Sequence, residues 1–259
     1  MKLTVFASGS SGNCLLLSGG GTDILIDAGI STRRLSDLLA ERCLSLQDIG
    51  GVLITHEYSD HISGLPGLLR RSGAEIFAPR TVAARLRGML LEIDERLRVI
   101  PVGEDFSLSR LRIRAFHTPH DTDESVGYRV EDGGVFALAT DMGCVTDEVR
   151  ENLRGADAVL IEANHDEDML RYGPYPVFLK RRILSDHGHL SNENCAALAR
   201  ELAESGTGTI ILGHLSRENN TPSAAMRAVG EALSGTRAAL LCAPAFGCLE
   251  VKVEERCLA

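Results

Sequence analysis

The sequence predicts a layered α/β fold in which helices cover β-sheets that pack face to face. Short apolar runs of the kind that form buried strands come in blocks, and helical patterns lie between and after these blocks. The chain has 259 residues, 44% of them hydrophobic, which is ordinary for a globular protein with a full core. No Pro-rich linker, low-complexity segment or strong internal repeat divides it, so residues 1–259 are interpreted as one domain.

The predicted strands are apolar runs separated by polar or glycine-containing segments. In the first part of the chain they lie at residues 2–6, 14–17, 23–27, 52–54, 75–78 and 111–116. In the second part they lie at residues 126–130, 135–140, 158–161, 209–212, 238–242 and 247–252.

Three predicted helices can be recognised by their first residues. Ser31 or Thr32 caps a leucine-rich helix, and Ser191 precedes a second apolar helical face. Thr221 caps a third helix with Pro222 at its first position, where the missing N–H has no intrahelical partner to lose. These helices supply the outer layers of the predicted fold.

Composition limits the classes of function. The net charge of −9 opposes broad attraction to nucleic acid, so any phosphate contact must be local. The compact basic patches lie at residues 33–34, 70–71 and 180–182, and each is interpreted first as a solvated helix face.

Two further features concern the cellular compartment. The first residues run into a Ser/Gly-rich turn without a long apolar stretch, which favours a cytoplasmic protein with no membrane partner. The seven cysteines are scattered and form no C-x-x-C pair. They are therefore interpreted as reduced core residues, and we expect neither a disulfide framework nor a thiolate zinc site.

A polar turn after the strand at 52–54 carries the strongest functional signal. It presents His56, Asp60 and His61 within six residues, and two imidazoles and a carboxylate this close can form a divalent-metal site. Apolar residues then recur at helical spacing, so Asp60 and His61 are expected at the start of a helix. The alternative is that Asp60 only caps that helix.

Five predicted strands end in a polar residue able to bind a ligand: Asp27, His56, Asp141, Glu162 and His214. If these ends lie along one edge, the side chains converge on one cleft, which is where α/β proteins tend to bind ligands. Buried polar residues are costly, so five at equivalent positions favour a common role. Structural pairing can also account for Asp27 and Glu162, and we expect Asp27 to accept a hydrogen bond from a ligating imidazole.

The series His56-x-Tyr58-x-Asp60-His61, followed by His120, Asp141 and His214, resembles the H-x-H-x-D-H, His, Asp, His pattern of the metallo-β-lactamase fold superfamily. Flanking segments are similar to its YycJ-like (WalJ-like) subgroup, at residues 7–13, 139–141, 162–166, 181–186, 188–192 and 214–216. The resemblance spans nearly the whole chain. It implies a four-layer αββα sandwich with two metals at its edge and, for this subgroup, 5′-to-3′ exonuclease action on DNA.

Carried over by position, the resemblance implies the following metal ligands: His56 and His120 for one ion, Asp60, His61 and His214 for the other, and Asp141 as a bridge. Two cations about 3.5 to 4 Å apart can share a hydroxide as nucleophile, polarise a phosphoryl oxygen and stabilise the leaving oxygen. Imidazoles and carboxylates without thiolate admit zinc, manganese or iron, and we expect one or two ions per chain.

Tyr58 departs from the pattern, because it stands where the superfamily has its second histidine. A phenol with a reference pKa near 10 is a poor ligand at neutral pH unless the metal deprotonates it. The site that contains His56 and His120 is therefore expected to bind its metal more weakly than the other. The alternatives are that one metal suffices or that Tyr58 hydrogen-bonds the substrate.

Two neighbouring histidines compete for one ligand position. His120 is favoured over His117, because Pro119-His120-Asp121 aligns with the Ser-His-Asp pattern of the subgroup. His117 is then a residue of the strand end, and His187 is interpreted as structural.

The catalytic candidates are Asp60, His189 and His165. His189, with His165 as second choice, is expected to contact a phosphate or to protonate the leaving oxygen, because imidazoles near a helix start suit an anion. The candidates for substrate binding are Tyr58, Ser10, Asn13 and Arg182. The turn at residues 8–13 is open to two interpretations, a simple hairpin or a lining of the cleft with hydroxyl and amide donors.

The leading functional hypothesis is a metal-dependent phosphodiesterase that acts on DNA as a 5′-to-3′ exonuclease. A second is a hydrolase of the same fold that acts on a small cyclic phosphodiester, thioester or lactone, which fold alone cannot distinguish. A third is a non-catalytic scaffold whose site has degenerated, as Tyr58 would then indicate. The acidic net charge opposes the DNA hypothesis unless a basic groove lies near residues 180–182.

Overall fold

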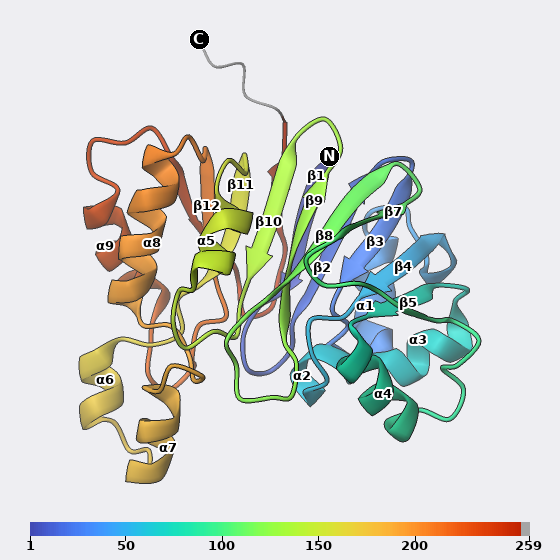
Figure 1. The fold of residues 1–259 in the computed structure, drawn as a ribbon, viewed down its shortest axis with the longest axis horizontal. Coiled ribbons are helices and arrows are strands. Elements are labelled where there is room, and N and C mark those ends of the chain that lie inside the picture. The colour runs from blue at the N-terminus through green and yellow to red at the C-terminus, as the bar shows by residue number, and fades with distance from the viewer. Residues whose placement is uncertain (255–259) are drawn as a thin grey trace.

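The computed structural model describes residues 1–254, in which two seven-stranded sheets face each other and helices cover both outer faces (Figure 1). This is the predicted four-layer α/β sandwich. The first sheet has the order β14-β1-β2-β3-β4-β5-β6 and is antiparallel up to β3 and parallel beyond it. Its strands are β1 (Lys2–Ala7), β2 (Cys14–Gly19), β3 (Thr22–Ile26), β4 (Ile49–Leu53), β5 (Glu75–Ala78), β6 (Leu97–Val99) and β14 (Leu249–Lys252).

The second sheet repeats this plan, with the order β13-β12-β11-β10-β9-β8-β7. It is antiparallel from β7 to β10 and parallel from β10 to β13. Its strands are β7 (Asp105–Leu108), β8 (Leu111–His117), β9 (Val126–Glu131), β10 (Val135–Ala139), β11 (Ala158–Glu162), β12 (Thr209–Gly213) and β13 (Ala239–Cys242).

The helices form the outer layers, and Figure 1 shows α6 and α7 extending past the end of the second sheet. On the side of the first sheet lie α1 (Thr32–Ala40), the 3₁₀ turn η1 (Leu46–Asp48), α2 (Ser59–Ile62), α3 (Leu65–Arg71) and α4 (Arg80–Met89). On the side of the second lie α5 (Asp147–Leu153), α6 (Glu167–Tyr172), α7 (Val177–Ile183), α8 (Asn192–Glu204) and α9 (Pro222–Ala232).

Alternation along the strands divides the apolar residues among three cores. In β3, Ile24 and Ile26 belong to the core between the sheets, whereas Leu25 belongs to the core beneath the helices of the first sheet. Successive side chains of a strand point to opposite faces, so a strand buried on both faces must be apolar throughout. A third core, which includes Val159 and Leu198, fills the space between the second sheet and its helices.

All twelve predicted strands are present. The prediction missed β6 and β7, two short edge strands. The three predicted helix caps are also present, since the side chains of Ser31, Ser191 and Thr221 each accept a hydrogen bond from a backbone N–H of the first turn.

The helix expected after Asp60 is broken into α2 and α3. The break lies at Gly64, whose N–H donates to the carbonyl of Ala28 at 2.7 Å. A Cβ at this position would lie 2.3 Å from the carbonyl oxygen of Ile30, so only glycine allows this close approach. Among residues 1–254, no helix is long and apolar enough to cross a bilayer.

Candidate metal centre

Strands from both sheets deliver polar side chains to one edge of the sandwich. Asp27 follows β3, Asp141 comes shortly after β10, and His214 directly follows β12. All three adopt left-handed backbone conformations, with φ of 59°, 56° and 54°. Such conformations are uncommon for residues other than glycine, and they persist where the surrounding structure imposes them. Here they turn each side chain sharply out of its strand and towards the common edge.

Three histidines are each fixed by one ring nitrogen. His61 Nδ1 lies 2.8 Å from Asp27 Oδ2, as predicted for Asp27, and His56 Nδ1 lies 3.1 Å from Thr55 Oγ1. His120 Nδ1 lies 3.3 Å from the carbonyl oxygen of Gly188. These contacts orient each ring through Nδ1, which is the usual arrangement of metal-binding histidines. The Nε2 of His56 has no hydrogen-bond partner among the described residues, whereas that of His61 also lies 3.0 Å from the side-chain amide of Asn13.

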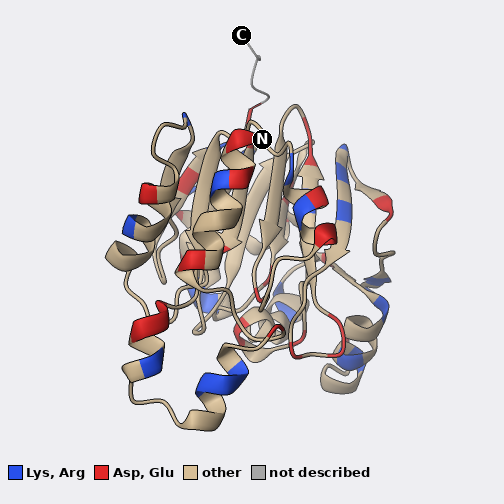
Figure 2. Cartoon of the chain, turned by 60° about the vertical axis from the view of Figure 1, so that its left-hand side comes forward, with Lys and Arg blue, Asp and Glu red and all other residues tan. Residues whose placement is uncertain are grey.

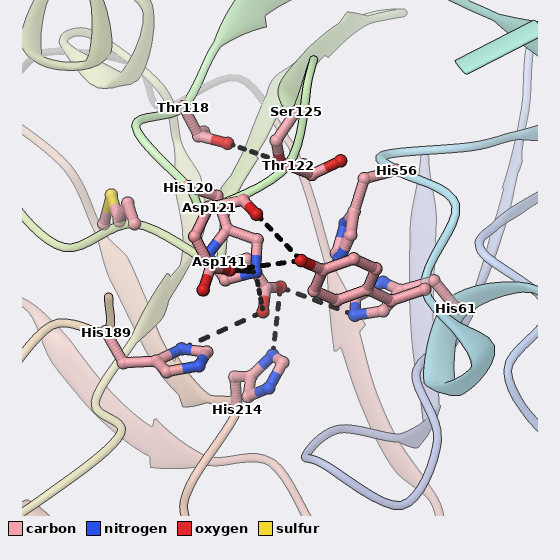
Figure 3. A network of polar contacts seen from close by, with 12 residues as sticks. His56, His61, Thr118, His120, Asp121, Thr122, Ser125, Asp141, His189 and His214 are labelled. Atoms are coloured by element: carbon pink, nitrogen blue, oxygen red, sulfur yellow. Dashed lines mark hydrogen bonds and ion pairs between the residues drawn. The ribbon is translucent and has the colours of Figure 1, made fainter. Parts of the chain in front are cut away.

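Asp141 lies at the centre of the cluster (Figure 3). Its Oδ2 is 3.1 Å from His214 Nδ1 and 3.5 Å from His61 Nε2. Its Oδ1 lies 4.0 Å from His120 Nε2. Burial acts to raise the pKa of this carboxyl, but the charges of His214 and His61 outweigh burial and lower the pKa well below its usual range. Asp141 is therefore an ionised acceptor held among imidazoles.

His56 Nε2 is buried without a hydrogen-bond partner in the described part of the chain, and Asp141 Oδ2 and His214 Nδ1, although 3.1 Å apart, are not aligned for a hydrogen bond. Such atoms are costly when they stay unsatisfied, and a divalent cation would satisfy them. The ligand atoms of His56, His120 and Asp141 all lie within 4.8 Å of one another. The residues present therefore fit the divalent metals that the fold implies.

Asp60 and His61 lie on α2, beside Asp141. The Oδ2 atom of Asp60 is 3.4 Å from His61 Nε2, and the side-chain amide of Asn13 contacts both of these atoms. Asp60 lines the cleft, whereas His61 is fully buried behind it.

His189 forms a pair with Glu162, which is fully buried at the end of β11. Glu162 Oε1 lies 2.7 Å from His189 Nδ1, and Oε2 accepts hydrogen bonds from the N–H groups of Met142 and Leu190. Burial lowers the pKa of His189, but the charge of Glu162 outweighs burial and raises it to about 9. Glu162 groups with Asp141, His189 and His214 as a possible ligand set. Because both of its oxygens are already engaged, it is better suited to orient His189.

Tyr58 does not point its hydroxyl at the histidines. The hydroxyl donates to the carbonyl oxygen of Asp121 at 2.9 Å, and the ring packs edge-on against His56 and His120. Burial and the charge of Asp121 raise the pKa of Tyr58. A protonated phenol engaged elsewhere is a poor metal ligand, which agrees with the expectation from the sequence.

A cleft of about 250 Å³ opens above this cluster. Three of the predicted substrate-binding residues, Ser10, Tyr58 and Arg182, line it together with Asp60, His120, Asp141, His189 and His214. Tyr175 and Leu179 complete one wall, and Arg182 on α7 pairs with Asp121. Figure 2 shows that α7 carries basic residues; among those of the described chain only Arg182 lines the cleft, where it is paired with Asp121.

The structure does not bring every predicted residue to the cleft. Asn13, a predicted substrate contact, is only 3% exposed, and its amide contacts Asp60 and His61 instead. His165, a predicted catalytic residue, is 1% exposed and does not line the cleft, and burial lowers its pKa to about 4. His117 points towards Glu148 at 3.4 Å, with more than half of its side chain exposed.

Comparison with known proteins agrees with this geometry. The model of the beta-lactamase superfamily domain matches residues 22–215, which is more than half of the chain. The protein belongs to the metallo-β-lactamase superfamily. Within it, exodeoxyribonuclease WalJ of Streptococcus pneumoniae is 40% identical over 223 residues, covering 85% of this chain and 83% of that protein. Exodeoxyribonuclease YycJ of Bacillus anthracis is 35% identical over 236 residues, covering 90% and 89%.

Solved structures support the fold of this superfamily member. The crystal structure of the metallo-beta-lactamase fold protein YhfI from Bacillus subtilis superimposes with a TM-score of 0.73 at 18% identity, covering 96% of this chain and 99% of that one. The family model and the identities to WalJ and YycJ confirm the predicted resemblance to the superfamily and to its YycJ-like subgroup.

The sequence did not reveal two pairings at the site of this superfamily member. The contact between Glu162 and His189 joins residues 27 positions apart, and that between Tyr58 and Asp121 joins residues 63 positions apart. The only available signal for the first was the position of Glu162 at the end of an apolar run. The sequence carried no signal for the second.

Proposed function

We propose that the protein is a metal-dependent nuclease that removes nucleotides from the 5′ end of DNA. The observation that carries the proposal is the convergence of histidines and carboxylates from both sheets around Asp141, at the base of an open cleft. The names of its relatives, exodeoxyribonucleases WalJ and YycJ, support DNA as the substrate. The free state of the six described cysteines suits the proposed cytoplasmic location.

The proposed ligands fall into two groups around Asp141. One metal would be held by His56 and His120, the other by Asp60, His61 and His214, and Asp141 would bridge them. When bound, such metals activate water as the nucleophile and neutralise charge on the phosphoryl group. The donor set contains imidazoles and carboxylates without thiolate, which admits zinc, manganese or iron.

His189 is the proposed proton donor to the leaving oxygen. Its ring lies in the cleft, and its pKa of about 9 means that it carries a proton at neutral pH. Glu162 holds Nδ1, so the other ring nitrogen is the one free to meet the substrate. A positioned imidazolium of this kind contributes about 100- to 10,000-fold to the rate of proton-dependent steps.

Arg182, Ser10 and Tyr58 are the proposed substrate-positioning residues, because all three line the cleft. A cleft of about 250 Å³ is smaller than typical sites for whole drug-sized ligands, which start at about 300 Å³. It therefore suits the reacting phosphodiester, while the rest of the strand lies outside.

Two other functions remain as alternatives. A small cyclic phosphodiester, thioester or lactone would also fit a cleft of this size. A non-catalytic scaffold is disfavoured by the buried atoms without partners around Asp141, which serve no structural purpose on their own.

Digestion of 5′-phosphorylated DNA tests the proposal. Single- and double-stranded substrates labelled at either end are incubated with manganese, with zinc and with EDTA. The proposal predicts stepwise release from the 5′ end that requires a divalent metal. Hydrolysis of a small chromogenic diester without any hydrolysis of DNA would instead support the small-molecule hydrolase. If neither substrate is hydrolysed, the result supports the non-catalytic scaffold.

The replacement of a ligand histidine by Tyr58 has a consequence for metal content. We propose that the site of His61 and His214 fills more completely than the site of His56 and His120, because the Tyr58 hydroxyl is engaged by Asp121. Elemental analysis after dialysis should give clearly fewer than two metals per chain. Two tightly held metals would contradict this expectation.

A further inference from the structure

A cluster of arginines around Phe246 stands beside the cleft and has no part in the proposed chemistry. The guanidinium carbon of Arg34 lies over the Phe246 ring, 5.0 Å from its centroid, and that of Arg217 lies 5.1 Å from the same centroid. The Phe246 residue is 41% exposed, so both guanidinium groups lie at the surface. Two cations thus gather on one exposed aromatic ring.

The charges of these arginines are not neutralised. Several other surface arginines pair with carboxylates, such as Arg112 with Glu131. Within residues 1–254, neither Arg34 nor Arg217 forms an ion pair with an acid, and neither side chain donates a hydrogen bond to a protein group. Their guanidinium N–H groups are therefore available to a ligand. Arginine presents these donors in a planar fork that matches a phosphate, and stacking on a ring leaves them free.

The cluster is built on segments that also form the metal centre. Arg217 follows Ser216, which lines the cleft, and lies three residues after His214. Arg34 lies in the first turn of α1, in the segment that follows Asp27.

The segment of Phe246 is joined to the same edge by hydrogen bonds. The carbonyl of Pro244 accepts from the N–H of Ser8 at 3.2 Å, and the hydroxyl of Ser8 accepts from the N–H of His214 at 2.9 Å. The cluster therefore lies on the same edge as the metal centre, next to the cleft wall formed by Ser216.

We propose that Arg34 and Arg217, held by Phe246, form a second binding site for backbone phosphates of a nucleic-acid strand that extends out of the cleft. This inference rests on the proposed function. A cleft of about 250 Å³ cannot hold several nucleotides, so the phosphates further along the strand must lie on the surface around it. In a protein with a net charge of −9, a local pair of free cations is what such a strand requires.

The proposal is tested with the Arg34→Ala/Arg217→Ala double variant and with Arg33→Ala as a matched control. Arg33 is an exposed neighbour on the same helix that contacts no aromatic ring among the described residues. Binding of a single-stranded phosphorothioate oligonucleotide, which resists hydrolysis, is measured by fluorescence anisotropy on the metal-loaded protein over a range of salt concentrations. Hydrolysis of a dinucleotide is measured in parallel.

The double variant should bind the strand about tenfold more weakly, as expected when two exposed charge pairs are lost. Each lost phosphate contact should also reduce the slope of log K against log salt concentration by about 0.7, so the double variant loses about 1.4. Dinucleotide hydrolysis should stay unchanged, because the metal centre is intact. Arg33→Ala should affect neither the slope nor the affinity by more than a small amount.

A second variant separates charge from geometry. Arg34→Lys/Arg217→Lys keeps both charges but cannot present a planar fork over the ring. This lysine variant should keep the wild-type slope of log K against log salt concentration while binding the strand more weakly. If the double alanine variant has the affinity and slope of Arg33→Ala, the proposed phosphate site is wrong even if DNA is hydrolysed. If the wild-type protein binds the strand with this arginine dependence but hydrolyses no DNA, the site stands and the proposed nuclease function fails.

Discussion

Gly29→Ala offers a steric test of how the backbone positions the metal centre. A Cβ at Gly29 would lie 1.6 Å from the carbonyl oxygen of Asp60, whereas real contacts of this kind stay beyond 3.0 Å. The Asp60 carbonyl would have to move by about 1.4 Å, and it currently accepts a hydrogen bond of 2.7 Å from the N–H of Asn13. Leaving that buried N–H without a partner costs about 1–3 kcal/mol.

The same movement changes the positions of Asp60 and His61 relative to Asp141. A misplacement of about 1 Å in a catalytic group can lower the rate by about 100-fold. Gly29→Ala should therefore lose both stability and DNA hydrolysis, measured as the melting temperature and as nucleotide release. The matched control is Gly88→Ala in α4, where a Cβ meets nothing within 4 Å and helix propensity rises. Wild-type melting and turnover in Gly29→Ala would refute the reasoning.

Four shorter predictions concern the histidines and the metals. His189→Ala should keep its metal content while turnover falls about 100-fold or more, and unchanged turnover would remove the proton-donor role. Glu162→Gln should shift the alkaline limb of the pH profile of kcat to lower pH, because the charge that raises the pKa of His189 is lost; an unshifted limb would exclude this coupling. His120→Ala should lower metal content and activity whereas His117→Ala should change neither, and the reverse result would exchange their roles. Saturating manganese should raise the melting temperature relative to EDTA, since about 100-fold excess over the Kd adds about 2.7 kcal/mol, and equal melting curves would count against a metal site.

The fold could be predicted from the sequence wherever burial imposes a pattern. β10 is apolar throughout, and β3 and β12 each contain an apolar run, at residues 24–26 and 210–212, because both of their faces are covered there. The edge strand β7 was not predicted, because it alternates between exposed and half-buried residues and contains no apolar run. The break between α2 and α3 was not predicted, because it depends on a hydrogen bond from the N–H of Gly64 to the carbonyl of Ala28, a contact between separate segments.

The site was predictable in its position more than in its details. Residues at strand ends, such as Asp27 and Asp141, had to lie at one edge once the strands belonged to two packed sheets. The orientation of a loop side chain follows from tertiary packing, so sequence reasoning assigned substrate contact to the buried Asn13 and a catalytic role to the buried His165. The pairing of Tyr58 with Asp121 depends on how two loops meet, which local patterns do not encode.

The most direct test of the central claim is to measure metal content and 5′-nucleotide release together in the wild-type protein and in Asp141→Asn. Since Asp141 lies between both proposed metal sites, the account predicts that the substitution removes bound metal and DNA hydrolysis together. An Asp141→Asn protein that contains no metal and still digests DNA at the wild-type rate would contradict it.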